Sequence, residues 1–340
     1  MPDFVPELMR EYGDAARAVL FRYLPSEEPR RHLYDLLADY PRRGGRGFRP
    51  TLCIATARAF GRTTEDALRT AASIELLHNA MLVHDDIEDE SIERRGRPAL
   101  HVTQGVPLAL NAGDALSLRS LRPLLDNQQR LGPWLSLRIL EEAERMARES
   151  AEGQAMELGW RRDNAVDVTE ADYLLMVLKK TCWLAVIYPT RVGALIGTGG
   201  AVDLEPFLRF GFFVGAAFQI QDDLLNLTGD QAQYGKELEG DLYEGKRTIM
   251  LVRLLAKARR SERERLERLL GRPRGERTAA EIRWARGLMD RYGCIDYARS
   301  VAHGLVGAAE HEFSRIFGHL PDSRDKRFLA AFPRWVIERS

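Results

Sequence analysis

The apolar and polar positions of this chain repeat with the period of a helix. Apolar residues recur three and four positions apart in several stretches, most clearly at 76–81 and 173–177. Helix starts are marked by a hydroxyl followed three residues later by a carboxylate, as in Thr169/Asp172, Ser261/Glu264 and Thr278/Glu281. Alternating strand patterns bounded by Asn-Gly or Asp-Gly turns do not occur in the sequence. The pattern predicts an all-α protein.

Breaks in this pattern indicate how the helices are grouped. The Gly-Thr-Gly-Gly segment at 197–200 ends one helix, and Asp203 with Pro206 opens the next. The segment 271–275, Gly-Arg-Pro-Arg-Gly, is the best candidate for a loop before a C-terminal helical extension. Because it is too short for a flexible interdomain linker, we predict one domain over residues 1–340, with 251–340 as helices that close the bundle.

Composition adds limits on the class of protein. Hydrophobic residues make up 45% of the 340 positions and charged residues 29%, which suits a soluble globular chain with a sizeable core. The 50 basic and 50 acidic side chains balance, so the overall charge gives no argument for a nucleic-acid partner. The three cysteines are far apart and odd in number, which argues against a disulfide framework. We expect them to be buried.

No segment indicates a membrane or an export route. The first residues lack a basic segment followed by an apolar run, as a secretory signal would require. No stretch approaches the roughly 20 apolar residues that span a bilayer. We therefore expect a cytoplasmic protein without a stable membrane anchor.

The first candidate site is an acid-rich segment at the end of an apolar helix, residues 74–89. On a helix, His78, Asp85 and Asp89 fall on one stripe with Asp86 beside them. Carboxylates one turn apart repel, and charge near an apolar interior is costly unless it is paired. Mg²⁺ would relieve both costs. The alternative is a solvated acidic face, which a lone acidic cluster would favour.

A second acidic cluster favours the metal site. The apolar segment 207–218 is followed by Gln219, Asp222, Asp223 and Asn226. Two helices with acid-rich ends can face each other across a shared cavity in a bundle. Together they would hold several Mg²⁺ ions, which in turn would bind a diphosphate. Asn226 supplies a neutral oxygen where a third Asp is expected, so this half should hold metal less tightly.

Basic segments accompany the two clusters. They are 94–98 (Arg-Arg-Gly-Arg-Pro), the glycine-rich turn 44–50 with two arginines, 179–181 (Lys-Lys-Thr) at the end of a helical stretch, and the Gly-Lys pairs 235–236 and 245–246. Each one alone is most simply a solvated surface charge. Beside two carboxylate clusters they indicate two anion sites, one bridged by metal and one held by side chains alone.

In this order, the motifs resemble the trans-type isoprenyl diphosphate synthases, which include farnesyl, geranylgeranyl and longer polyprenyl diphosphate synthases. The resemblance covers residues 40–250 and rests on Gly-Gly-Arg-Gly-Phe-Arg-Pro, His-Asp-Asp-Ile-Glu-Asp with Arg-Arg-Gly, Lys-Thr, Gln-Ile-Gln-Asp-Asp and two Gly-Lys pairs. It implies the isoprenoid synthase fold, an all-α single-domain bundle around a deep central cavity. It also implies a homodimer.

The resemblance implies a role for each matching residue. The ligands of the Mg²⁺ ions that bridge to the allylic diphosphate would be Asp85, Asp86 and Asp89. A further Mg²⁺ would be bound by Asp222, supported by Asp223 and Asn226. The residues that hold the allylic diphosphate would be Arg94, Lys180, Lys236 and Lys246. Those that hold isopentenyl diphosphate would be Arg46, Arg49, His78 and Arg95.

The implied reaction joins isopentenyl diphosphate to an allylic diphosphate. Thr181 and Gln219 would offer oxygens where positive charge develops on the prenyl carbon. Product length should follow cavity depth, and the positions one turn before Asp85 carry Met81 and Ala80 rather than an aromatic floor. With Leu77 as a softer floor one turn deeper, we expect geranylgeranyl diphosphate as the main product. Arg46 replaces the Lys usual in the family, which keeps the charge but changes the geometry.

Three alternatives remain at the level of sequence. A terpene cyclase-like enzyme would ionise a prenyl diphosphate without a second substrate, and it would not need the residues Arg46, Arg49, His78 and Arg95. A metal-dependent phosphohydrolase is suggested by His84-Asp85, but the other histidines form no second matching pattern. A silent partner subunit of another prenyltransferase would be expected to have lost its acidic motifs.

Overall fold

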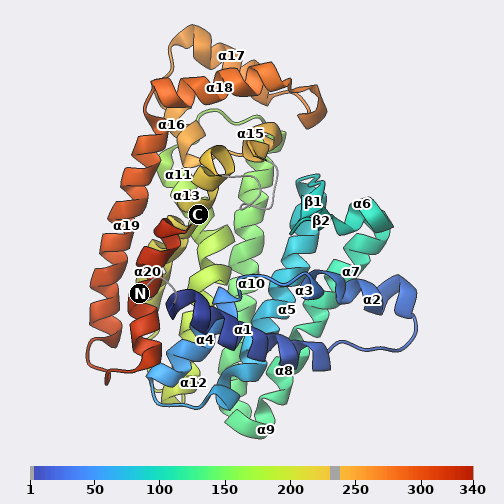
Figure 1. The fold of residues 1–340 in the computed structure, drawn as a ribbon, viewed down its shortest axis with the longest axis vertical. Helices are drawn as coiled ribbons and strands as arrows, with labels where there is room; N and C mark the ends of the chain where they lie inside the picture. Colours follow the sequence, from blue (N-terminus) through green and yellow to red (C-terminus); the bar gives the residue numbers. More distant parts are fainter. Residues whose placement is uncertain (1–3, 230–237, 340) are drawn as a thin grey trace. The chain divides into compact units, whose positions relative to one another are not determined.

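The computed structural model describes residues 4–229 and 238–339, most of them in helices (Figure 1). The chain divides into two compact units. The first unit consists of the segments 1–146, 184–211 and 311–332. The second consists of the segments 147–183, 212–310 and 333–340.

The first unit holds most of the N-terminal elements and one short hairpin. Its elements are α1 (Phe4–Arg22), η1 (Arg30–Tyr34), α2 (Asp35–Leu37), α3 (Asp39–Arg42), α4 (Phe48–Ala59), α5 (Thr64–Glu88), β1 (Glu93–Arg94), β2 (Arg97–Pro98), α6 (Leu100–Gln104), α7 (Val106–Arg119), α8 (Leu121–Asp126), α9 (Gln128–Leu131) and α12 (Tyr188–Thr198). The two strands pair antiparallel.

The regular elements in the described residues of the second unit are all helices. Its elements are α11 (Glu170–Val177), α15 (Gly240–Glu244), α16 (Ile249–Lys257), α17 (Arg260–Leu270), η3 (Arg274–Glu276) and α18 (Ala279–Arg291). Five further segments begin in one unit and end in the other: α10 (Pro133–Arg162), the π-helix η2 (Leu178–Ile187), α13 (Glu205–Thr228), α19 (Cys294–Phe317) and α20 (Arg324–Glu338).

Helix α5 is the central element of the first unit. It starts with a capping interaction that the sequence analysis did not anticipate, in which the Asp66 carboxylate accepts the Thr63 N–H at 3.1 Å. Along its length it packs against α1, α4, α7, α8 and α12. The middle of α5 contributes apolar residues to this packing, among them Ala71, Ile74 and Leu76, but it also buries the polar residues Glu75 and Asn79.

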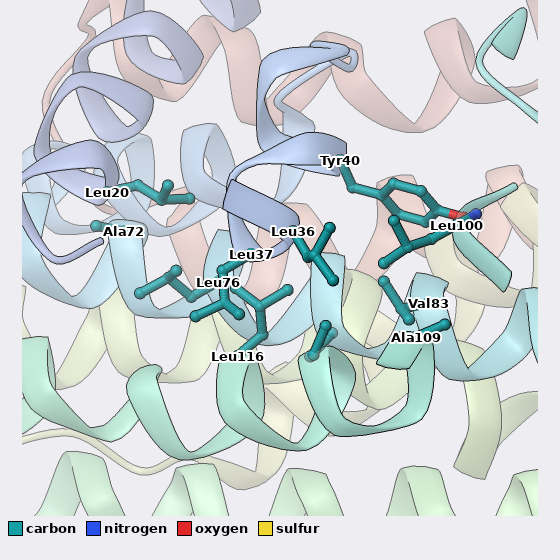
Figure 2. Packing of buried hydrophobic residues seen from close by; sticks show 12 residues of the cluster. Leu20, Leu36, Leu37, Tyr40, Ala72, Leu76, Val83, Leu100, Ala109 and Leu116 are labelled. Carbon is teal, nitrogen blue, oxygen red and sulfur yellow. The ribbon is translucent and has the colours of Figure 1, made fainter. Parts of the chain in front are cut away.

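The core beside α5 fixes where its acidic end lies. Figure 2 shows the buried cluster formed by Leu20 of α1, Leu36 and Leu37 of α2, Tyr40 of α3, Ala72, Leu76, Ala80 and Val83 of α5, Leu100 of α6, and Ala109, Ala112 and Leu116 of α7. Burial of each large side chain stabilises the fold by about 1.5–3 kcal/mol. Tyr40 is the polar exception, and its hydroxyl lies next to the backbone of Leu100 (Figure 2).

Several local predictions can be compared with this structure. The helix starts at Thr169 and Thr278 are confirmed, with both hydroxyls accepting the N–H three residues on. The start at Ser261 was wrong, because α17 begins at Arg260 and its Glu262 carboxylate accepts the Arg259 N–H at 3.3 Å. The three cysteines are buried and form no disulfide. Among the described residues, no helix has the length and apolar character needed to cross a bilayer.

Candidate active site

The C-terminal end of α5 concentrates negative charge in the first unit. Asp85 is half-buried, Asp86 is completely buried, and Asp89, which follows the helix, is 2% exposed. Carboxylates at the C-terminus of a helix oppose its macrodipole and repel one another. This end of α5 therefore requires cations to be stable.

Asp86 already has a cation in the structure. Arg94 donates from Nε to Asp86 Oδ1 at 2.9 Å and also contacts that oxygen through Nη2. The Tyr40 hydroxyl donates to Asp86 Oδ2 at 2.5 Å. Burial opposes the charge on Arg94, but Asp86 outweighs it and raises the pKa of the guanidinium. Asp86 thus holds Arg94 and Tyr40 here, whereas the sequence analysis gave it the role of a metal ligand.

The two arginines of the hairpin after α5, Arg94 and Arg95, have different partners. Arg94 ends β1, and Arg95 with Gly96 forms the two-residue turn, with φ angles of 54° and 71°. Arg95 donates from Nη1 to the Tyr40 carbonyl at 3.0 Å, away from Asp86. Arg43, which follows the last residue of α3, holds the hairpin in place by donating to the carbonyls of Arg94 and Pro98, each at 2.9 Å.

Arg95 belongs to a second group of charges around His78. Glu75 and His78 lie one short turn apart on α5, with 3.6 Å between Glu75 Oε1 and His78 Nδ1. Burial and the positive charge of Arg49 lower the pKa of His78 to about 4, although Glu75 opposes the shift. Burial disfavours ionised Glu75, but His78, Arg49 and Arg95 outweigh it and lower the pKa of Glu75 to about 2. The imidazole is therefore neutral and the carboxylate ionised at neutral pH.

The glycine-rich turn before α4 completes this region. A Cβ at Gly45 would lie only 2.9 Å from Arg95 Nη2, so a larger residue there would displace the guanidinium. Arg49 stands in the first turn of α4, and its guanidinium lies over the Phe48 ring at 4.6 Å. Arg46 is exposed. The first unit therefore gathers Arg49, His78 and Arg95 in one group, as predicted for an anion site held by side chains.

In the second unit, the acidic part of α13 is linked to η2 by a chain of hydrogen bonds. The Thr181 hydroxyl donates to Gln219 Oε1 at 2.8 Å, and the Gln219 amide donates to Asp223 Oδ1 at 2.7 Å. The Tyr173 hydroxyl of α11 donates to Asp223 Oδ2 at 2.9 Å. Burial raises the pKa of Asp223 well above its usual range, and the negative charges of Asp241 and Asp222 add to the effect.

The other two positions of this motif have different partners. Asp222 Oδ1 accepts from Arg339 Nη2 at 3.2 Å, and the Arg339 guanidinium also lies over the Phe218 ring at 4.0 Å. Asn226 is buried, and its side-chain oxygen accepts the Asp241 N–H at 3.1 Å. Asn226 therefore ties the start of α15 to α13.

The predicted lysines of the second unit are paired with carboxylates. Lys180 donates to Glu157 at 2.9 Å, and Lys246 lies 2.7 Å from Glu244. The segment 179–181 was expected to end a helical stretch, but it lies inside η2, where the helix widens instead of ending. Gly153 of α10 lets η2 approach closely at this point, since a Cβ there would lie 2.2 Å from the Lys180 nitrogen. Lys236 lies outside the described residues.

The carboxylates of the two acidic groups suit a hard cation that also binds the phosphates of a substrate. Among the residues described, no group of three or more His, Cys, Asp or Glu side chains is arranged to hold a metal ion. Mg²⁺ usually keeps several waters and binds through one or two carboxylates together with substrate phosphates. Asp85 and Asp89, one turn apart, and the pair Asp222 and Asp223 match that requirement. The like charges around Asp223 would be relieved by such an ion.

Some residues of the site were missed by sequence reasoning. Glu75 could have been identified from the sequence, because it precedes His78 by three positions on the same helix. Tyr40 and Tyr173 reach their carboxylates across 46 and 50 positions. Arg339 was not itself missed, because the sequence suggests it and Arg334 as arginines near the terminus that help cover the cavity. Its contact with Asp222 spans 117 positions, and no local pattern marks that partner.

Comparisons with known proteins agree with this arrangement. Residues 30–288 match the polyprenyl synthetase family. A short chain isoprenyl diphosphate synthase of Methanothermobacter thermautotrophicus is 35% identical over 300 residues, which cover 87% of each chain. A geranylfarnesyl diphosphate synthase of Aeropyrum pernix is 33% identical over 303 residues, covering 87% of this chain and 91% of the relative.

A solved structure extends the agreement to the fold. The crystal structure of a geranylgeranyl pyrophosphate synthetase from Pyrococcus horikoshii is similar with a TM-score of 0.86 and 29% identity, covering 99% of this chain and 98% of the other. The chain therefore has the all-α isoprenoid synthase fold that the sequence predicted. It belongs to the polyprenyl synthetase family, whose members are trans-prenyltransferases and in general depend on Mg²⁺.

Proposed function

We propose that this prenyltransferase joins isopentenyl diphosphate to an allylic diphosphate and makes geranylgeranyl diphosphate as its main product. The observation that carries the proposal is that α5 and its hairpin build two separate charged groups in the first unit. Arg94 pairs with the acidic end of α5, whereas Arg95 joins Arg49 and His78. Two diphosphates need two such groups, and an enzyme that only cyclises one prenyl diphosphate needs only the first.

The allylic diphosphate is assigned to the acidic groups. By the family resemblance, each acidic group would hold Mg²⁺ for this substrate: Asp85 and Asp89 in the first unit, and Asp222 with Asp223 in the second. When bound, the Mg²⁺ ions stabilise the negative charge that builds on the leaving diphosphate. Arg94, Lys180 and Lys246 would add direct contacts to its oxygens, and Lys236 remains a prediction from the sequence. Asp86 keeps Arg94 in position.

The reaction then follows from charge separation. The C1–O bond of the allylic diphosphate breaks, and its electron pair leaves with the diphosphate. The double bond of isopentenyl diphosphate attacks the allylic C1, and a proton lost from the new chain passes to the released diphosphate. The Thr181 hydroxyl donates a hydrogen bond to Gln219 Oε1, so the lone pairs of Thr181 Oγ1 are available to stabilise the cation.

Product length is assigned to two side chains on the stripe of α5 that carries Asp85. Met81 lies one turn before Asp85, and Leu77 lies one turn before Met81; both are half-buried. Ala80 is packed into the core cluster of Figure 2, which removes it from the candidates for the cavity floor. An unbranched Met and a Leu form a softer floor than an aromatic ring. This supports a product longer than fifteen carbons.

The homodimer is assigned to one apolar surface of the first unit. Among the described residues, exposed large hydrophobic side chains of α6, α7, α8 and α10 form a series: Val102, Val106, Leu110, Leu118, Leu121, Leu125, Trp134 and Leu137. Several of them recur four positions apart, so they share a face of α7 and α8. A surface of this kind is characteristic of a subunit interface, and a second copy of the chain would cover it by two-fold symmetry.

Product analysis tests the proposal. The protein is incubated with Mg²⁺, labelled isopentenyl diphosphate and dimethylallyl, geranyl or farnesyl diphosphate, and the products are identified by mass. We expect a labelled twenty-carbon diphosphate, and Met81→Phe should shorten it. Cyclic hydrocarbons without label would indicate a terpene cyclase, and no turnover of any primer would indicate a silent partner subunit. Light scattering of Leu118→Glu tests the interface, where wild type should be a dimer and the variant a monomer.

A further inference from the structure

The anion site around His78 contains one residue of the opposite charge. Glu75 is 7% exposed and lies on α5 next to the side chains assigned to isopentenyl diphosphate. A buried carboxylate weakens the attraction of a site for an anion and is itself costly to bury. Its presence in this position calls for a specific role.

Hydrogen bonds fix the direction of the Glu75 carboxylate. Asn79, which is completely buried, donates from Nδ2 to the Glu75 carbonyl at 2.7 Å and to Glu75 Oε1 at 3.4 Å. The Asn79 side-chain oxygen accepts from Arg95 Nη1 at 3.5 Å. Glu75 Oε1 is thereby held 3.6 Å from His78 Nδ1. The contact is long for a hydrogen bond and would shorten if the imidazole became charged.

This geometry indicates which nitrogen of His78 carries the hydrogen, although Nδ1 makes no hydrogen bond in the structure. An ionised carboxylate only accepts, so a hydrogen on Nδ1, the nitrogen that faces it, is the favourable arrangement. In a neutral imidazole Nε2 then carries a lone pair and cannot donate to a diphosphate oxygen. His78 can bind the diphosphate as a donor only if it takes up a proton. A carboxylate on one side and a diphosphate on the other would stabilise the imidazolium.

The surrounding charges change sign when the ligand binds. The charged groups that act on His78 are Glu75 on its own helix, Arg49 from α4 and Arg95 from the hairpin. Their charges amount to one net positive charge, which disfavours an imidazolium. A trianionic diphosphate in the site would turn this into two net negative charges. The ligand therefore removes the main obstacle to protonation.

We propose that Glu75 is a positioning residue that allows His78 to take up a proton from solvent when isopentenyl diphosphate binds. The inference rests on the proposed function, because it assumes that this ligand occupies the His78 group. The proton is released again when the diphosphate leaves the site. The affinity should then strengthen as the pH falls through the His78 pKa of the complex, and this gain should end near the His78 pKa of about 4 in the free protein.

Calorimetry in buffers of different ionisation enthalpy measures the protons taken up. Isopentenyl diphosphate is titrated into wild type, His78→Gln and Glu75→Gln near pH 7. Because the ligand also titrates, the uptake by His78 is the difference from His78→Gln. We expect wild type to take up nearly one proton more than either variant. Equal uptake in wild type and His78→Gln overturns the inference, and the absence of binding or turnover in wild type overturns the proposed function instead.

Kinetics distinguish positioning from a loss of stability. Glu75→Gln should raise the KM for isopentenyl diphosphate about tenfold and leave that for the allylic substrate unchanged. The control is Glu142→Gln, which removes the charge of another buried carboxylate, ion-paired with Arg191 at 2.6 Å. It should lower stability without changing either KM. An equal rise of both KM values in Glu75→Gln, or a rise in the control, contradicts the assignment.

A measurement on the unaltered protein avoids any doubt about folding of the variants. The ¹⁵N shifts of the His78 imidazole report its tautomer and its charge. We expect a neutral ring protonated at Nδ1 in the free protein and a doubly protonated ring in the complex with isopentenyl diphosphate. A ring that stays neutral in the complex contradicts the inference.

Discussion

The two acidic groups, one at the end of α5 and one on α13, share a sequence pattern but differ in their partners. In the first, the buried Asp86 is ion-paired with Arg94 and also bonded to Tyr40. In the second, the buried Asp223 accepts hydrogen bonds from two neutral donors, Tyr173 and Gln219. Burial and neighbouring carboxylates then raise the pKa of Asp223. An Asp-Asp pair on a helix thus determines where the carboxylates lie. Their charge state depends on partners outside the pair.

The two acidic groups also differ in the third residue of their motifs, which is Asp89 in the first and Asn226 in the second. Asp89 follows the last residue of α5 and is buried, which brings a further negative charge to the first group. Asn226 brings no charge and binds the backbone N–H of Asp241. If both groups hold Mg²⁺ as proposed, we therefore expect the first to bind it more tightly than the second. Variants of matching positions test this difference.

The largest effect is expected for Asp85→Ala. If Asp85 holds Mg²⁺ on the allylic diphosphate, kcat/KM should fall about 10³-fold, because the leaving group loses its stabilisation. Steady-state kinetics at saturating Mg²⁺ measure the loss. Asp296→Ala, which removes an exposed carboxylate of α19 with 85% side-chain exposure, is the control and should retain wild-type rates. A loss of less than tenfold in Asp85→Ala contradicts the assignment.

The two buried carboxylates should differ in their contribution to stability. Asp86→Asn leaves Arg94 buried without its counter-charge and should cost about 3 kcal/mol. Asp223→Asn removes a carboxylate whose charge is already disfavoured and should cost about 1 kcal/mol. Urea unfolding of both variants measures the free energies of unfolding. Equal losses would mean that the different partners of the two groups have no energetic consequence.

The tyrosines that reach these carboxylates provide a smaller test. Tyr40→Phe removes one hydrogen bond to Asp86 and one from the Leu100 N–H, so it should cost about 2 kcal/mol. Tyr173→Phe removes one bond to Asp223 and should cost about 1 kcal/mol. Urea unfolding again provides the values. A greater loss in Tyr173→Phe would reverse the order that the contacts predict.

The smallest effect is expected for Asn226→Asp. The change restores a third carboxylate and keeps an oxygen that accepts the Asp241 N–H. The Mg²⁺ concentration for half-maximal activity should fall about threefold, because the second group gains charge. A Mg²⁺ titration of activity measures this change. A higher requirement for Mg²⁺ would show that Asn226 acts through the contact with Asp241 alone.

The sequence predicted most of what lies within one or two turns of a single helix. The spacing of His78, Asp85 and Asp89 on α5 follows from helical geometry, and so do the helix starts at Thr169 and Thr278. The partner of Asp86 was not predictable in the same way, because Arg94 lies beyond a hairpin turn and Tyr40 belongs to another helix. The close approach of η2 to Gly153 was not predictable either, because the two segments are far apart in the sequence.

The central claim is that the first unit serves two diphosphates through two separate groups. The most direct test is the KM of each substrate in Asp85→Asn and Arg49→Gln. We expect Asp85→Asn to raise the KM of the allylic substrate alone, and Arg49→Gln to raise that of isopentenyl diphosphate alone, each about tenfold. If each variant raised both values by the same factor, the two groups would form a single site and the assignment of two subsites would be wrong.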